Sequence, residues 1–190
     1  MLVGKRIVLR PGRERDLERI YDAAADVRDL GPYWPLRMPS EQAWMKRFRE
    51  NGWWEEDHGI LLITDRNDAL LGQMSFFKAS VYQNASELGY RLYRPEHWGQ
   101  GTMTEAVGLL VPYLFATKTI DRIQATVIPG NMGSQRVLEK CGFQLEGVMR
   151  KAVFHNGRNT DLKLYSILRE EAVGWERVAK ELLAGSQTDR

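Results

Sequence analysis

The sequence contains a single cysteine, Cys141, and only three histidines among its 190 residues. One cysteine excludes an intrachain disulfide and any metal site built from several thiolates, and it suits a reducing compartment. The histidines, at positions 58, 97 and 155, lack the spacing of metal ligands. We therefore expect no bound metal, and we take Cys141 to be a small, packed apolar residue.

A strong charge of one sign is also missing, as is any long apolar run. Lysine and arginine total 27 against 25 acidic residues, so the net charge of +2 supplies no long-range attraction for nucleic acid or an anionic membrane. The first ten residues, MLVGKRIVLR, alternate and carry charge, which fits neither a signal peptide nor a spanning helix. We expect a cytoplasmic protein that binds neither nucleic acid nor membrane.

The length and the apolar content of the chain fit one domain. With 190 residues, of which 43% are hydrophobic, the chain can bury one substantial core. The sequence shows no repeat, low-complexity tract or linker. We place a single domain at residues 1–184 and a frayed tail at residues 185–190.

Hydrophobic periodicity and turn residues outline the secondary structure. Helices are expected at about 16–29, from about residue 40, at about 101–117 and 134–140, and in a polar tail around Trp175. Pro112 predicts a kink or an early end of the third helix. Turns are expected at Asn67-Asp68 and Asn156-Gly157. Strands are expected at 5–10, 59–64, 70–77, 87–93, 122–128, 145–154 and 159–168.

The stretch HWGQGTMTEAV at residues 97–107 places two glycines directly before a helix start. Backbone N–H groups of the loop and of the first helical turn can converge there on an anion, because glycine leaves the approach open. A plain turn between a strand and a helix is the alternative, since a lone G-x-G pattern is weak evidence. Neither a Rossmann fingerprint nor a P-loop is present, so any diphosphate cradle here is of another kind.

Two blocks of the sequence together resemble one family. YRPEHWGQGTMTEAV at 93–107 is similar to the pyrophosphate loop of the GNAT superfamily of acyl-CoA N-acetyltransferases, in its RimJ/RimL branch. Residues 127–168 resemble the Asn-x-x-Ser helix, the Gly-Phe turn and the closing hairpin of the same branch, and the similarity runs loosely from Arg6 to Leu168. The resemblance implies an α+β fold with a mixed, mostly antiparallel sheet of about seven strands, flanked by about four helices and containing a splayed pair of central parallel strands.

The resemblance also implies acetyl-CoA as cofactor, with its pyrophosphate on the glycine loop and its pantetheine arm beside the strand that precedes it. Met103 stands where the family usually has glycine or alanine. The residues that would bind the cofactor are Arg91, Leu92, Tyr93, Trp98, Gly99, Gln100, Gly101, Thr102, Met103, Thr104, Asn131 and Ser134.

Acyl transfer from a thioester to an amine needs a neutral amine, stabilisation of an oxyanion and a proton for the departing thiolate. The family motif implies that Asn131 orients the cofactor arm or a water and that Ser134 reaches the sulfur. Many relatives use a tyrosine as proton donor where this chain has Leu138, which leaves that role to Ser134. From spacing alone, Asn131 and Ser134 could equally cap a helix. Glu87 is the candidate base, acting through water, although it could be an exposed strand residue.

Aromatic residues in two loops suggest an acceptor groove. Tyr33, Trp34, Trp53 and Trp54 lie near a short acidic run at 55–57, and His155 precedes the last hairpin turn. Aromatic faces beside acids suit a cationic amine, but the same tryptophans could be core packing. We expect these five side chains to contact the acceptor.

The ease of deprotonation favours one class of acceptor. An α-amine with a pKa near ~7.8 costs about 1 kcal/mol to neutralise at pH 7, whereas a lysine amine near ~10.4 costs roughly 4.6 kcal/mol. A site without an obvious strong base therefore suits a protein or peptide N-terminus. A small amine, such as a polyamine or an antibiotic, and a non-catalytic acyl-CoA-binding module remain alternatives. The protein could be a monomer or a homodimer.

Overall fold

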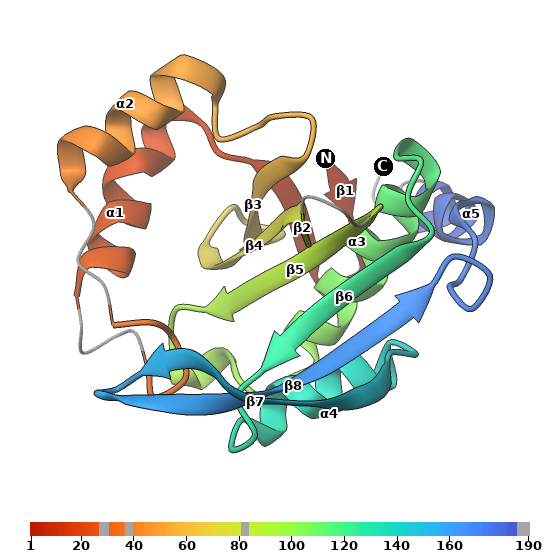
Figure 1. Cartoon of the computed structure of the whole chain (residues 1–190). Helices are drawn as coiled ribbons and strands as arrows, with labels where there is room; N and C mark the ends of the chain where they lie inside the picture. The colour runs from red at the N-terminus through yellow and green to blue at the C-terminus, as the bar shows by residue number, and fades with distance from the viewer. Residues whose placement is uncertain (27–30, 37–39, 81–83, 186–190) are drawn as a thin grey trace.

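The computed structural model describes residues 1–26, 31–36, 40–80 and 84–185, and within them the chain forms one eight-stranded sheet (Figure 1). The strands lie in the order β1-β2-β3-β4-β5-β6-β8-β7. Their bounds are β1 Leu2–Val3, β2 Ile7–Pro11, β3 His58–Asp65, β4 Leu70–Lys78, β5 Ala85–Leu92, β6 Arg122–Val127, β7 Gln144–His155 and β8 Arg158–Leu168.

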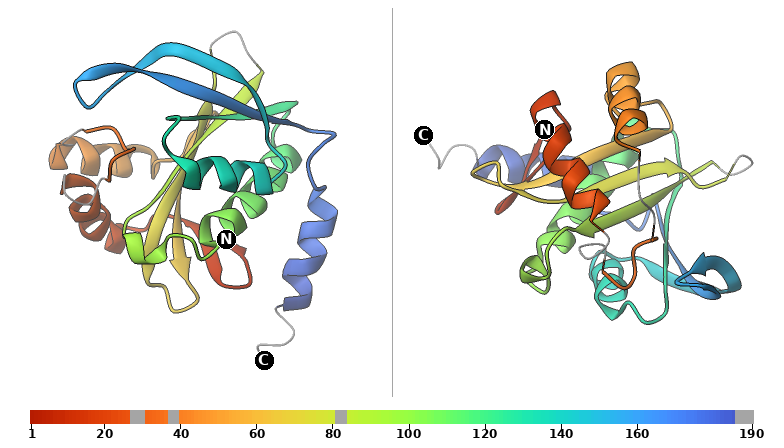
Figure 2. Two further views of the ribbon diagram at one scale, coloured as in Figure 1. Left: turned by 90° about the horizontal axis from the view of Figure 1, so that it is seen from below. Right: turned by 90° about the vertical axis from the view of Figure 1, so that its left-hand side faces the viewer.

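Helices cover both faces of this sheet (Figure 2). Helices α1 and α2 lie on one face, α3 and α4 lie on the other, and α5 packs beside α3, where Tyr113 and Trp175 meet with ring centroids 6.0 Å apart. The bounds are α1 Leu17–Ala25, α2 Glu41–Asn51, α3 Thr102–Thr117, α4 Met132–Lys140 and α5 Trp175–Gly185, with short 3-10 turns at Glu14–Asp16 and Pro95–His97. None of the helices in the described ranges is both long and apolar enough to cross a bilayer.

The parallel pair β5 and β6 departs from the antiparallel pattern of the rest of the sheet. The two strands pair only from Ala85 to Glu87 on β5 and from Arg122 to Gln124 on β6. Beyond Glu87 the strands diverge, while β5 stays paired with β4 as far as Leu92. The expected splay between central parallel strands is therefore confirmed, and it opens the middle of the sheet.

The fold class expected from the sequence is confirmed, with two additions. The described residues contain eight strands and five α-helices instead of about seven and about four. Strand β1 has only two residues, too few to show alternation. Helix α5 is the helix expected in the polar tail around Trp175, which the count of about four helices from the resemblance does not include. The first helix ends at Ala25 with Asp26 as its C-cap, and residues 27–29 of its expected range lie outside the described residues, as do residues 186–190 of the expected tail.

Helix α3 runs unbroken to Thr117, so the early end expected at Pro112 is wrong. The helix is buried on most of its surface, because Leu109, Pro112 and Phe115 are buried in addition to the single apolar face read from the sequence. Burial of one large side chain contributes about 1.5–3 kcal/mol, so the packing of α3 offsets the roughly 3 kcal/mol cost of an internal proline.

Candidate active site

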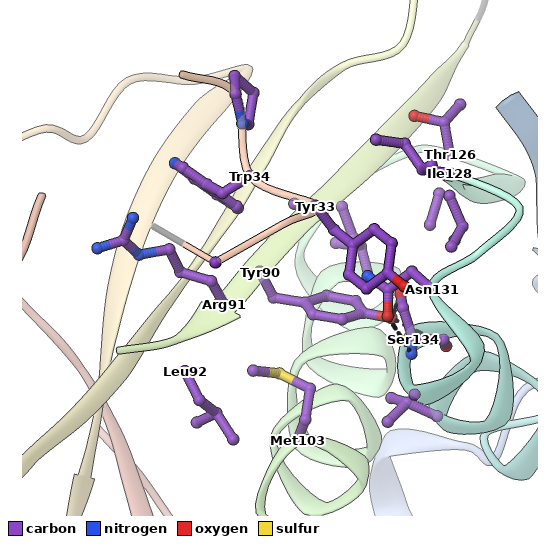
Figure 3. A pocket seen from close by; sticks show the side chains of 18 of the residues that line it. Tyr33, Trp34, Tyr90, Arg91, Leu92, Met103, Thr126, Ile128, Asn131 and Ser134 are labelled. Atoms are coloured by element: carbon purple, nitrogen blue, oxygen red, sulfur yellow. Dashed lines mark hydrogen bonds between the residues drawn. The ribbon is translucent and has the colours of Figure 1, made fainter. Parts of the chain in front are cut away.

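A cleft of about 690 Å³ lies where β5 and β6 part (Figure 3). The loop at 31–35 covers it on one side, and the glycine loop and the start of α4 border it on the other. Of the residues singled out from the sequence, those that line the cleft are Tyr33, Trp34, Glu87, Arg91, Leu92, Trp98, Gly99, Met103, Asn131, Ser134 and His155.

The glycine loop leaves its backbone N–H groups without protein partners. Gly99 and Gly101 have φ angles of 71° and 80°, in the left-handed region that glycine adopts without strain. Among the described residues, no protein group accepts from the N–H of Gly99, Gln100 or Gly101. The first backbone bond of α3 runs from Glu105 N to Gly101 O, so the N–H groups of the first helical turn are free as well.

Open space lies beside Gly99. A Cβ added at Gly99 would meet no atom within 4 Å, and no side chain caps α3 at Gly101. Six consecutive N–H groups of the described residues, from residue 99 to residue 104, therefore lie free at the start of a helix whose dipole favours negative charge. This arrangement fits a diphosphate. Met103 is buried in the core and lines the cleft with its side chain.

Strand β5 presents main-chain groups to the cleft beyond the splay. Tyr93 N donates to Leu71 O at 2.9 Å, and its hydroxyl donates to Gln73 Oε1 at 2.7 Å, so Tyr93 is engaged by β4. Because main-chain groups alternate sides along a strand, those of Leu92 and Tyr90 face the gap where β6 has diverged. A cofactor arm would pair with these two residues, and Tyr93 contributes packing.

Asn131 and Ser134 start helix α4 at the edge of the cleft. Asn131 is the N-cap residue, and its Oδ1 accepts from Ser134 N at 3.1 Å. The capping role weighed from the sequence is therefore real, and it fixes the Asn131 side chain and the Ser134 backbone at the cleft. Leu138, at the position where many relatives have tyrosine, is fully buried and cannot reach the cleft.

Tyr90, which the sequence analysis did not single out, contacts Ser134. Its hydroxyl lies 2.9 Å from Ser134 Oγ, and its ring lines the cleft beside Asn131 (Figure 3). Burial raises the pKa of the Tyr90 phenol well above its usual range, although the Ser134 hydrogen bond lowers it. The phenol therefore stays protonated at neutral pH and can donate to Ser134. The sequence signal for this position is the alternation of the strand, which places Tyr90 on the same face as Leu88 but does not indicate the contact with Ser134.

Glu87 lies at the last paired position before the strands part. Its carboxylate accepts from Gln124 Nε2 and from Thr126 Oγ1, both at 2.9 Å. Both donors belong to the β6 region, so the carboxylate bridges the base of the splay and faces the cleft. Two fixed hydrogen bonds hold it in one orientation, as a group that receives a proton through water requires.

The loop at 31–35 is tied to the rest of the site by three contacts. The Tyr33 hydroxyl donates to Gly130 O at 2.7 Å, and His155 Nε2 donates to Pro32 O at 2.7 Å. Trp34 stacks on the guanidinium of Arg91, which lies 5.2 Å from the ring centroid. The loop therefore links α4 to the last hairpin and lies over the cleft, with Tyr33 pointing toward Asn131 (Figure 3).

Trp53 and Trp54 do not line the cleft, which corrects their expected place in the acceptor groove. Trp53 is 1% exposed and packs against Trp44 and Phe48, with ring centroids 4.7 and 5.0 Å away. Trp54 packs edge-on against Phe76 at 5.3 Å. Trp53 stabilises the packing of α1 and α2 on the sheet, because a large apolar ring gains from burial. Trp54 stays 37% exposed and lies outside the cluster that Trp53 forms with Trp44 and Phe48.

The part of the chain that the structure describes offers neither a reactive cysteine nor a cluster of metal ligands. Cys141 donates to Thr104 O at 3.5 Å, and burial raises the pKa of its thiol to about 11, so it is a weak nucleophile at neutral pH. No three histidine, cysteine or acidic side chains of the described ranges gather as metal ligands. The cleft relies on backbone amides, hydroxyls and one carboxylate.

A splayed pair of parallel strands with free backbone amides beside the gap is the arrangement expected above for an acyl-CoA-dependent transferase. The comparisons with known proteins agree. Residues 6–144 match the acetyltransferase (GNAT) domain family. A probable N-acetyltransferase of Bacillus subtilis, YjcK, is 34% identical over 90% of this chain and 98% of its own. The chain belongs to the GNAT acetyltransferase family.

Two further comparisons are with proteins whose names state an acceptor. The ribosomal-protein-serine acetyltransferase of Escherichia coli is 27% identical over 70% of this chain and 74% of its own. A spermidine N-acetyltransferase from Vibrio cholerae, solved in complex with CoA and spermine, superposes with a TM-score of 0.76 at 22% identity, covering 87% of this chain and 96% of that one. The second likeness concerns the fold alone.

Proposed function

We propose that this acetyltransferase uses acetyl-CoA to acetylate the N-terminal α-amine of a protein or peptide by direct attack in a ternary complex. The observation that carries the proposal is the line of free amides from Gly99 to Thr104, which leads into the gap between β5 and β6 and ends at Ser134 and Glu87. This path has the features needed to hold a diphosphate at one end and a reacting carbonyl at the other.

The residues of the cleft fit the cofactor. The free N–H groups of the glycine loop would hold the pyrophosphate, and the main chain of Tyr90 and Leu92 would pair with the arm. Acetyl-CoA, when bound, supplies the acetyl group as a thioester. Asn131 keeps the first turn of α4 in place and so presents the hydroxyl of Ser134 to the cleft.

Ser134 and Tyr90 supply the proton. The Tyr90 hydroxyl lies 2.9 Å from Ser134 Oγ, and either oxygen can donate. In the arrangement with Tyr90 as donor, the serine O–H is free to point into the cleft. The serine would donate that proton to the leaving thiolate and take up a proton from a water molecule, and Tyr90 would orient it. This pair replaces the tyrosine that many relatives carry at the position of Leu138.

Glu87 takes part on the acceptor side. Held by Gln124 and Thr126, its carboxylate would accept a proton from the amine through a water molecule. Deprotonating an α-amine at pH 7 costs about 1 kcal/mol, so one carboxylate of this kind is enough to accept its proton. Deprotonating a lysine amine costs roughly 4.6 kcal/mol.

A polyamine is the second candidate acceptor, favoured by the spermidine N-acetyltransferase of similar fold. Among the described residues that line the cleft, however, Glu87 is the only acidic side chain. A polyamine carries several positive charges, and a single carboxylate leaves the others without partners. The lining therefore supports an acceptor with one charged amine.

An acceptor panel tests the proposal. Purified protein is incubated with acetyl-CoA and three acceptors, namely a peptide with a free N-terminus and no lysine, the same peptide with a blocked N-terminus and one lysine, and spermidine. Thiol release and product mass are recorded. We expect turnover on the free N-terminus, at least about tenfold faster than on the lysine peptide. Faster acetylation of spermidine or lysine would overturn the α-amine assignment.

A further inference from the structure

Helix α3 carries an acidic residue in its first turn, directly beside the free amides. Glu105 is the only acid there, and its side chain is 16% exposed. A carboxylate in the first turn of a helix is attracted by the positive end of the helix dipole. It would then compete with a diphosphate for the same donors and repel it. In this protein the carboxylate is held elsewhere.

Arg6, from the bend between β1 and β2, engages both oxygens of the Glu105 carboxylate. The Arg6 backbone N–H donates to Oε1 at 3.0 Å, and its Nε donates to Oε2 at 3.2 Å. The same guanidinium donates through Nη1 to Gln100 O at 2.5 Å. One arginine therefore holds the acid of the helix and a carbonyl of the glycine loop at the same time.

Two glycines make room for this contact. A Cβ at Gly4 would overlap Glu105 Oε1, so only glycine lets the carboxylate reach the backbone of the N-terminal bend. A Cβ at Gly101 would lie 3.0 Å from Arg6 Nη2, so the guanidinium also rests against the loop. The N-terminal bend, the glycine loop and the first turn of α3 thus form one connected unit.

We propose that Arg6 is a positioning residue of the cofactor site. It draws the Glu105 carboxylate away from the free amides and neutralises its charge, so that those amides stay available to a diphosphate. Its bond to Gln100 O turns that peptide so that the carbonyl points away from the anion and the next N–H points toward it. The inference rests on the proposed use of acetyl-CoA.

The electrostatic part of this role predicts a specific pattern among variants. Arg6→Gln removes the guanidinium and leaves only the backbone N–H of residue 6 on Oε1, so the carboxylate keeps an unneutralised charge near the amides, and we expect coenzyme A to bind about tenfold more weakly. In Arg6→Gln/Glu105→Gln the competing charge is gone, so binding should recover by at least about threefold relative to Arg6→Gln. Lys5→Gln removes a positive charge from the adjacent exposed position and should leave binding within about twofold of wild type.

Calorimetric titration of coenzyme A into the four proteins at one salt concentration measures these affinities without requiring turnover. Thermal unfolding of each protein without ligand shows that all of them are folded. If the wild type binds no coenzyme A, the proposed function fails. If the wild type binds and Arg6→Gln binds equally well, or the double variant shows no recovery, the role assigned to Arg6 is overturned.

Discussion

The hydroxyls of Tyr90 and Ser134 lie 2.9 Å apart at the point where the cleft meets α4. We expect Ser134→Ala to lower kcat by about tenfold or more with little change in KM for acetyl-CoA, because it removes the proton donor. Tyr90→Phe should lower kcat by a smaller factor, because the serine hydroxyl stays but loses its orienting partner. Steady-state kinetics with both substrates varied measures the split.

Tyr93→Phe is the matched control. Its phenol is buried one residue beyond the end of β5 and donates to Gln73, not to Ser134, so its loss should cost stability and leave kcat unchanged. Burial raises the pKa of the Tyr90 phenol above its usual 10, so the phenol should stay protonated up to pH 10. The plot of kcat against pH should therefore show no decrease caused by ionisation of Tyr90 in this range. Equal kcat values for Tyr90→Phe and wild type would contradict the positioning role.

At the scale of elements, the layer of α1 and α2 depends on one aromatic side chain. Trp53 is fully buried against Trp44 and Phe48. We expect Trp53→Ala to lower the free energy of unfolding by about 3–5 kcal/mol, as is usual for a large buried ring. The neighbouring Trp54, 37% exposed, serves as control, and Trp54→Ala should cost about 1 kcal/mol. Urea unfolding that ranks the two variants in the opposite order would refute this account.

A second element-scale feature is the charge pair that links β6 to β7 across β8. Arg122 donates to both oxygens of Glu146, and Ser166 on β8 donates to Oε1. The hydrogen bonds from Arg122 and then from Ser166 lower the pKa of Glu146 from 4.5 to about 2. A depressed carboxylate pKa stabilises the fold above the unfolded value and loses that contribution as pH falls through the folded value.

Glu146→Gln should therefore be less stable than wild type at pH 7 by up to about 1 kcal/mol, because the pair is partly exposed. The difference should shrink as pH falls from 4.5 toward 2. Urea midpoints at several pH values measure it, with Glu170→Gln as a control at an exposed acid. A difference that stays constant over this pH range would show that the charge pair does not contribute.

At the scale of the whole molecule, the cleft interrupts the sheet between β5 and β6. The amides of Tyr90 and Leu92 face this gap, whereas that of Tyr93 is bonded to β4. Coenzyme A should therefore slow hydrogen exchange at Tyr90 and Leu92 and leave Tyr93 unchanged. Exchange followed by mass spectrometry or NMR, with and without the ligand, measures this. Equal protection at all three amides would argue against pairing at the splay.

The parts of this protein that the sequence predicts well are those set by local chemistry. The glycine loop and the Asn131 cap each depend on a few adjacent residues, so their spacing reveals them. Trp53 was wrongly assigned, because an aromatic residue in an acidic loop looks the same whether it turns inward or outward. Tyr90 was missed because its partner is 44 residues away, and only the fold brings the two together.

The parallel pairing of β5 and β6 stops after three residues on each strand. Because the pairing stops there, the sheet lacks the hydrogen bonds that a continued ladder would supply. Substitutions that extend the pairing of β5 and β6 would therefore raise the stability of the protein and lower its turnover. Selection for thermal stability alone should therefore favour substitutions that close this gap. Substitutions that raise stability without loss of turnover should be placed in the outer strands of the sheet instead.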